Sequence, residues 1–164
     1  MGGANGGKNS DRIDNNQSLV DGGANGGIAG QDMVLHLYHP DNVRVNIGGV
    51  DNHQVNNVCI GTYYCLIYTE LGPVIGVFHN YASIPSQSNS IHSKIQIQAY
   101  GQLVCDNARA IGGKQHILTS DGYQISLSVT GSLLYMNSRA PTPAEIADPA
   151  IPMVIMTSDD KWNP

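Results

Sequence analysis

Basic residues are scarce in this sequence, which has 8 Lys and Arg against 13 Asp and Glu in 164 residues. The few cations do not cluster, so nucleic acid, whose phosphates need a basic surface, is excluded as an expected partner. Charged residues make up only 13% of the chain, whereas helical bundles usually have faces rich in Glu and Lys. Abundant Gly, Asn, Gln and Ser instead favour a β fold with many turns.

Long apolar runs and paired cysteines are also lacking. No segment approaches ~18 consecutive apolar residues, and residues 1–18 lack the apolar core of a signal peptide, so no membrane partner is expected. The three cysteines, Cys59, Cys65 and Cys105, do not form a disulfide framework and favour a reducing, intracellular (cytoplasmic) location. Cys59 and Cys65 share one strand-like run, and we interpret them as packed residues.

The length of the chain fits one domain. Residues 1–17 are polar and glycine-rich and are interpreted as a flexible leader. Residues 18–139 are predicted to form a β domain that ends in a hairpin. Residues 140–164 are predicted to be a proline-rich extended tail, in which residues 154–156 add one edge strand.

Apolar and polar residues alternate over residues 43–47, which predicts a half-buried strand, and residues 58–68 are predicted to form a long apolar and aromatic strand. Further strands are predicted at residues 74–79, 115–119, 123–129 and 133–136. Gly48-Gly49 and the polar residues that follow predict a mobile hairpin between two strands, and Asp121-Gly122 predicts a tight hairpin turn. Ser90 is predicted to cap a short helix that ends at Gly101, with His92 and Lys94 on its outer side.

The most distinctive stretch is Leu19-Val20-Asp21-Gly22-Gly23-Ala24, in which an apolar strand ends in a carboxylate followed by small residues. Glycines allow a sharp turn and a close approach of backbones, so Asp21 is expected to be exposed on a backbone-lined surface. Two neighbouring carboxylates can share a proton and perform acid-base catalysis. Since the chain offers one suitable acid, such a dyad requires a symmetric homodimer.

Other chemistries find little support in the sequence. Residues 2–9 approach a phosphate-binding loop, but no strand precedes them and Asn9 replaces the required Ser or Thr. The pairs His36/His39 and Asp51/His53 lack a third ligand at a recognisable spacing. No nucleophile elbow of the G-x-S-x-G type is present. We therefore expect no metal and no cofactor.

The stretch around Asp21 resembles the active-site loop of retropepsin-like aspartic proteases, which reads hydrophobic-hydrophobic-Asp-Ser/Thr-Gly-Ala. The resemblance extends over residues 18–163 to copia-type retroelement polyprotein segments of the kind abundant in diatoms. It rests on Asp-x-Gly-Ala-Asn-Gly-Gly, Gly-x-Asp-Asn-His-Gln, a His-Ser helix, Gly-Gly-x-Gln and Thr-Ser-Asp, which occur here at residues 21–27, 49–54, 92–93, 112–115 and 157–159.

This resemblance implies a small, closed, barrel-like fold of the retropepsin type, mainly β, with one or two short helices and a C-terminal hairpin. It implies an aspartic endopeptidase that cleaves a retroelement polyprotein as a homodimer, without a metal. Asp21 would be the catalytic residue, and Gly22, Gly23 and Ala24 would shape its loop. The flap over the polypeptide substrate would comprise Gly48, Gly49, Val50, Asp51, Asn52 and His53.

One position departs from the family pattern, because Gly22 replaces the Ser or Thr whose hydroxyl braces the two loops of the dimer. Losing such a buried brace costs on the order of 1–2 kcal/mol per subunit. Two hypotheses therefore remain open. The chain is an aspartic endopeptidase, or it is a retropepsin-like structural remnant of a polyprotein without catalytic activity.

Overall fold

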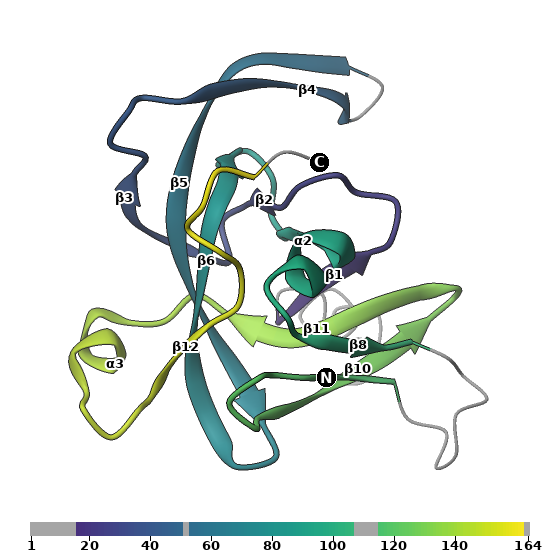
Figure 1. The fold of residues 1–164 in the computed structure, drawn as a ribbon, viewed down its shortest axis with the longest axis vertical. Coiled ribbons are helices and arrows are strands. Elements are labelled where there is room, and N and C mark those ends of the chain that lie inside the picture. Colours follow the sequence, from purple (N-terminus) through teal and green to yellow (C-terminus); the bar gives the residue numbers. More distant parts are fainter. Residues whose placement is uncertain (1–15, 51–52, 107–114, 163–164) are drawn as a thin grey trace, which may run out of the picture.

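The computed structural model describes residues 16–50, 53–106 and 115–162, without the side chains of residues 49, 50 and 53. The predicted mainly β architecture is confirmed (Figure 1). The strands are β1 Gln17–Asp21, β2 Ile28–Ala29, β3 Val34–Tyr38, β4 Arg44–Val50, β5 His53–Thr69, β6 Gly72–Ser83, β7 Ile91–Ser93, β8 Leu103–Cys105, β9 His116–Leu118, β10 Gln124–Thr130, β11 Leu133–Arg139 and β12 Met153–Ile155. The helices are α2 Lys94–Ala99 and α3 Pro143–Ala147.

Six strands pair in a closed ring, in the order β5, β6, β2, β7, β1 and β11, with β11 returning to β5. In this ring β1 pairs in parallel with β7 on one side and antiparallel with β11 on the other. Hydrogen bonds on both edges therefore fix the short strand that ends in Asp21.

The burial pattern follows from which faces of the strands are covered. In β1, Ser18 and Val20 face inward and are buried, whereas Leu19 and Asp21 face outward and are only partly buried. In β6, residues 74–78 are buried without interruption, because separate apolar clusters cover the two faces of this strand. The largest cluster fills the ring and includes Phe78, Ile97 and Met136, none of which is exposed.

The predicted helix over residues 91–101 begins later than expected. Ile91 to Ser93 form strand β7, and Ser93, not Ser90, caps the helix by accepting a hydrogen bond from the Gln96 N–H at 3.2 Å. The prediction that His92 lies on the outer side is wrong, because this side chain is fully buried. Pairing of β7 with β1 overrides the local helical pattern.

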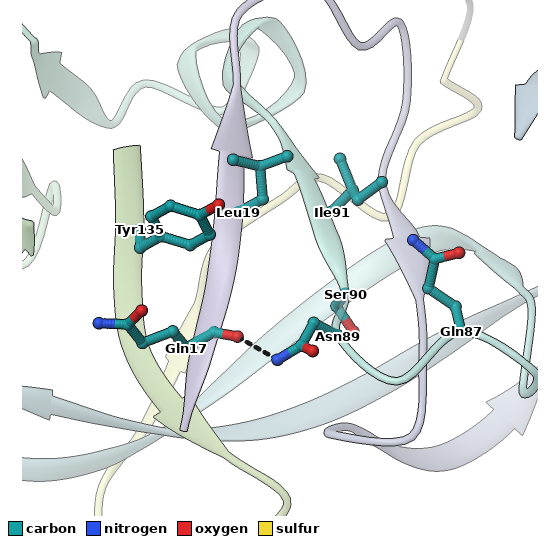
Figure 2. A pocket seen from close by; sticks show the side chains of 7 residues that line it. All are labelled: Gln17, Leu19, Gln87, Asn89, Ser90, Ile91 and Tyr135. Carbon is teal, nitrogen blue, oxygen red and sulfur yellow. Dashed lines mark hydrogen bonds between the residues drawn. The ribbon is translucent and has the colours of Figure 1, made fainter. Parts of the chain in front are cut away.

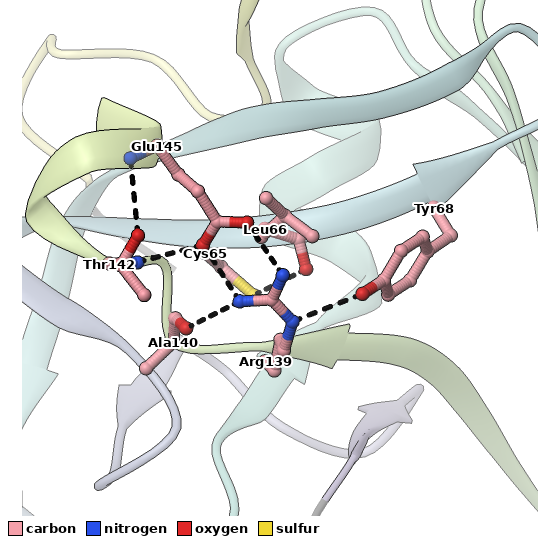
Figure 3. Close-up of polar contacts among 7 residues, drawn as sticks. All are labelled: Cys65, Leu66, Tyr68, Arg139, Ala140, Thr142 and Glu145. Carbon is pink, nitrogen blue, oxygen red and sulfur yellow. Dashed lines mark hydrogen bonds and ion pairs between the residues drawn. The ribbon is translucent and has the colours of Figure 1, made fainter. Parts of the chain in front are cut away.

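Residues 140–152 differ from the extended tail that their prolines predict, because they contain helix α3. Thr142 and Glu145 form a capping box, and Pro143 occupies the first turn, where it has no N–H to leave unpaired. Figure 3 shows how Arg139 fastens this helix to the sheet: its guanidinium donates to both Glu145 oxygens, at 2.8 and 2.6 Å, and to the Tyr68 hydroxyl at 3.0 Å. These contacts with Arg139 lower the pKa of Glu145 to about 2.

The strand predicted at residues 154–156 is confirmed as β12, which pairs in parallel with β6. The Asp121-Gly122 hairpin is also confirmed, and Gly122 has a φ of +97° in the turn between β9 and β10. Residues 1–15 of the predicted leader lie outside the described residues. Within the described part of the chain, no helix has the length and apolar character needed to cross a bilayer.

Candidate active-site cleft

Asp21 is the last residue of β1, paired with Ser93 of β7. Its Oδ1 accepts a hydrogen bond from the Gly23 N–H at 2.8 Å, and its carbonyl accepts one from the Ala24 N–H at 3.4 Å. The carboxylate therefore caps the turn that follows it. Among the described residues no donor contacts its Oδ2. This oxygen is left for a ligand, a water molecule or a second chain.

Side chains near helix α2 hold the segment that follows, here named the Asp21 loop (residues 22–27). Ser93 Oγ donates to the Ala24 carbonyl at 2.8 Å, and Gln96 Oε1 accepts from the Gly27 N–H at 2.8 Å. Gly27 itself is packed against the Tyr81 ring, which a Cβ atom would approach to 2.2 Å. The loop needs glycine at this position because no side chain fits.

Gly22 has a different environment from Gly27. It is exposed, and a Cβ atom added to it would contact only the Lys94 side chain, at 3.9 Å. Gly22 is also absent from the glycines with positive φ, so its backbone suits an ordinary L-residue. A serine therefore fits at position 22 without strain.

A cleft of about 1010 Å³ opens between the Asp21 loop and strand β4. Figure 1 shows β4 and the adjoining part of β5 extending over the loop that joins β1 to β2. Val45 and Ile47 of β4, Ile60 of the adjoining strand β5 and Ile28 of β2 give the cleft an apolar lining. Lys161 and Trp162, near the C-terminal end of the described chain, also line it.

The hairpin predicted as a flap is observed as a structural element. Strands β4 and β5 pair antiparallel up to Val50 opposite His53, and Gly48 lines the cleft. Gly49 and Val50 belong to β4, whereas Asp51 and Asn52 lie outside the described residues. The hairpin borders the same cleft as Asp21, which the sequence could only suggest.

Asp21 is the only carboxylate among the described residues that line this cleft. Asp32, which sequence reasoning overlooked, is buried elsewhere and accepts hydrogen bonds from the Ser90 N–H at 2.9 Å and the Ser90 hydroxyl at 2.5 Å. Burial raises the pKa of Asp32. Because Ser90 Oγ also accepts from the Gly30 N–H, this carboxyl group joins two turns and has a structural role.

A smaller pocket of about 290 Å³ adjoins the cleft (Figure 2). Leu19, Ile91 and Tyr135, from three neighbouring strands, form its apolar part, and Asn89 Nδ2 donates to the Gln17 carbonyl at its edge. Ile91 and Gln87 line both spaces. Since Leu19 lies on the same face of β1 as Asp21, an apolar surface continues from the candidate site across the sheet.

A buried chain of hydrogen bonds holds the strands below the site. The Tyr81 hydroxyl contacts His92 Nδ1 at 2.7 Å, His92 Nε2 contacts the Ser18 hydroxyl at 2.9 Å, and Ser18 contacts Ser138 at 2.8 Å. Burial lowers the pKa of His92 to about 3, so the imidazole is neutral. This chain connects β6, β7, β1 and β11, and it thereby fixes the strand that carries Asp21.

The other candidate residues from the sequence do not assemble into a site. His36 stacks on Tyr64 with ring centroids 4.8 Å apart, and His39 Nδ1 accepts from the Asp41 N–H at 3.1 Å. No group of three metal-ligating side chains occurs among the described residues. Cys65 is fully buried, which raises the pKa of its thiol to about 12, whereas Cys59 and Cys105 are partly buried and unpaired with one another.

Comparisons of the chain with protein-family models, with curated proteins and with solved structures find no match. The site must therefore be interpreted from its own geometry.

Proposed function

We propose that this protein is an aspartic endopeptidase of the retropepsin-like type, which cleaves a retroelement polyprotein as a homodimer. The observation that carries the proposal is the position of Asp21, at the end of a doubly paired strand and on the wall of a cleft covered by the β4–β5 hairpin. A cleft of this size, with an apolar lining and one carboxylate among its described residues, suits an extended peptide.

Cleavage requires a second carboxylate, which a second copy of the chain would supply. Two adjacent carboxyl groups share one proton, because like charges about 3 Å apart cannot both ionise. The ionised member takes a proton from water, whose oxygen attacks the peptide carbonyl carbon, and the protonated member donates to the carbonyl oxygen. The tetrahedral intermediate then collapses: one of its hydroxyls returns a proton to the dyad, the C–N bond breaks, and the nitrogen leaves as an amine with the other proton of the dyad. Exposure of Gly22 and Gly23 beside Asp21 supports such an approach of two loops.

A second candidate function is a structural, non-catalytic segment of a polyprotein. Gly22 favours it, because glycine has no hydroxyl with which to brace the paired loops and it adds backbone freedom where rigidity is needed. In that case the cleft and the hairpin persist without hydrolysis.

A cleavage assay on a peptide library distinguishes the two functions. Wild-type protein is compared with Asp21→Asn, which keeps the size of the side chain and removes its ability to ionise. We expect cleavage by the wild type and at least about a hundredfold less by the variant. Equal cleavage by both proteins, or no cleavage at concentrations where sedimentation detects a dimer, would rule out the enzyme.

A further inference from the structure

A C-terminal strap (residues 156–162) runs from β12 along β6 to the cleft. Four hydrogen bonds with β6 fix it before it arrives there: Met156 N–H to the Val77 carbonyl at 2.9 Å, Thr157 hydroxyl to the His79 carbonyl at 2.8 Å, and Asn80 Nδ2 to the Ser158 and Asp160 carbonyls at 3.0 and 2.6 Å. The strap is therefore an ordered part of the domain.

Trp162 joins the strap to the Asp21 loop. Its indole Nε1 donates to the Asn25 carbonyl at 2.6 Å. The indole also lies against Gly26, where an added Cβ atom would be 3.5 Å from Nε1 and 3.6 Å from Cδ1. The side chain is only half-buried, and it forms part of the cleft wall.

Three side chains thus hold the backbone of the loop at successive points, namely Ser93 at Ala24, Trp162 at Asn25 and Gln96 at Gly27. Ser93 and Gln96 do not border the cleft, whereas Trp162 does. Trp162 is therefore the member of this set that touches both the loop and the space for a ligand.

We propose that Trp162 is a positioning and specificity-determining residue of the cleft. Its N–H fixes the loop that follows Asp21, and its partly exposed ring offers an apolar, aromatic surface to a side chain of the bound peptide. Aromatic side chains stack on such a surface more favourably than small ones do. The second part of this inference rests on the proposed function, because it takes the ligand to be a polypeptide.

Hydrogen–deuterium exchange tests the positioning role without any ligand. Trp162→Phe keeps a ring and removes the N–H donor. Asn80→Gly removes the clamp on the strap at a position whose φ of 61° glycine adopts freely. We expect about fivefold faster exchange at residues 22–27 in Trp162→Phe, as the loss of one hydrogen bond implies. Exchange should also be faster in Asn80→Gly, which loses both hydrogen bonds from Asn80 to the strap.

Asp160→Ala is the matched control for this measurement. It lies on the same strap, and it contributes its backbone, not its side chain, to the bonds given above. We expect wild-type exchange of the loop in this variant. Unchanged exchange in Trp162→Phe, or equal acceleration in Asp160→Ala, would overturn the positioning role.

Fluorescence tests the contact between Trp162 and a bound peptide, because Trp162 is the single tryptophan of the chain. Asp21→Asn protein, which cannot cleave, is titrated with a capped hexapeptide that has two central phenylalanines and with the matched peptide that has two central alanines. We expect a change of Trp162 emission on binding and about tenfold tighter binding of the phenylalanine peptide. In the double variant Asp21→Asn/Trp162→Ala, calorimetry should show that this preference is lost.

The outcomes separate this inference from the proposed function. If the peptide binds without changing the emission of Trp162, or if the preference for the phenylalanine peptide survives Trp162→Ala, the role of Trp162 in peptide specificity is overturned while the peptidase proposal stands. If the wild-type chain binds the phenylalanine peptide through Trp162 but cleaves no library peptide, the role of Trp162 in peptide binding is supported and the peptidase function is ruled out. Failure to bind either peptide overturns both, and the exchange measurement still decides the positioning role.

Discussion

At the scale of single residues, three glycines of the Asp21 loop have three different functions. Gly27 is required because the Tyr81 ring occupies the space of a side chain. Gly26 provides a flat surface for the Trp162 indole and has room for a methyl group at 3.5 Å. Gly22 has open space, and its replacement tests the chemistry of the site without disturbing the packing.

Replacing Gly27 by Ala is expected to destabilise the domain by about 3 kcal/mol, because the new methyl group overlaps the buried Tyr81 ring. Gly26→Ala is the matched control and should change the free energy of unfolding by less than about 1 kcal/mol. Urea denaturation of both variants measures the difference. Similar values for the two variants would contradict the close packing at Gly27.

Replacing Gly22 by Ser is expected to strengthen the dimer by about 1–2 kcal/mol per subunit and to raise the rate of peptide cleavage. The hydroxyl would restore a donor at the loop, and the backbone accepts the side chain without strain. Gly48→Ser, at another open position of the cleft, is the control for an added hydroxyl. Sedimentation equilibrium and peptide cleavage give the two readouts, and an equal gain from Gly48→Ser would contradict the bracing role.

At the scale of elements, strand β7 shows why the site could be predicted only in part. The strands of the β4–β5 hairpin and the turn after Asp21 follow from alternation and from glycine, and both were predicted. Strand β7 has three residues, and it is a strand because it pairs with β1, which lies about 70 positions earlier in the chain. No local pattern encodes that pairing, so the cap at Ser93 and the burial of His92 were missed.

Helix α3 and Asp32 illustrate two other limits. The capping-box pattern at Thr142 and Glu145 is visible in the sequence, but the four prolines of residues 140–152 predict an extended tail. Asp32 is in a turn, where an exposed carboxylate is usual, and only its contact with Ser90 across 58 positions explains its burial. Residues whose partners are distant therefore had to come from the structure.

The neutral, buried His92 makes stability depend on pH. Its pKa is about 3 in the folded state against 6.5 for an ordinary histidine. Between these values the unfolded chain binds a proton that the folded chain does not. The free energy of unfolding should therefore fall by about 1.4 kcal/mol for each pH unit below 6.5, and this contribution should be constant above that pH.

Denaturant titrations between pH 7 and 4 measure this dependence. His92→Gln keeps two hydrogen-bonding groups but has no titrating imidazole. The slope of its unfolding free energy against pH should therefore be smaller than that of the wild type by the contribution of one proton. His39→Gln, at a histidine outside the buried chain, should keep it. Identical slopes for wild type and His92→Gln would contradict a neutral His92.

At the scale of the whole molecule, the described residues give the cleft one carboxylate, that of Asp21, so the proposed activity is a property of two chains. Mixing wild type with a tenfold excess of Asp21→Asn should reduce cleavage well below that of wild type alone, because mixed dimers carry one ionisable member. The same excess of Asp41→Asn, at an exposed turn, should not inhibit. Activity unaffected by Asp21→Asn would indicate that one chain suffices.

The closed ring of strands also has a consequence for synthesis of the protein. Strand β1 is made early, but its partners in β7 and β11 follow much later, as the contact between Ser18 and Ser138 across 120 positions shows. Such distant pairing is slow to form. A nascent chain therefore carries Asp21 long before it has a cleft, so a peptidase of this design would be inert while the ribosome is still extending it.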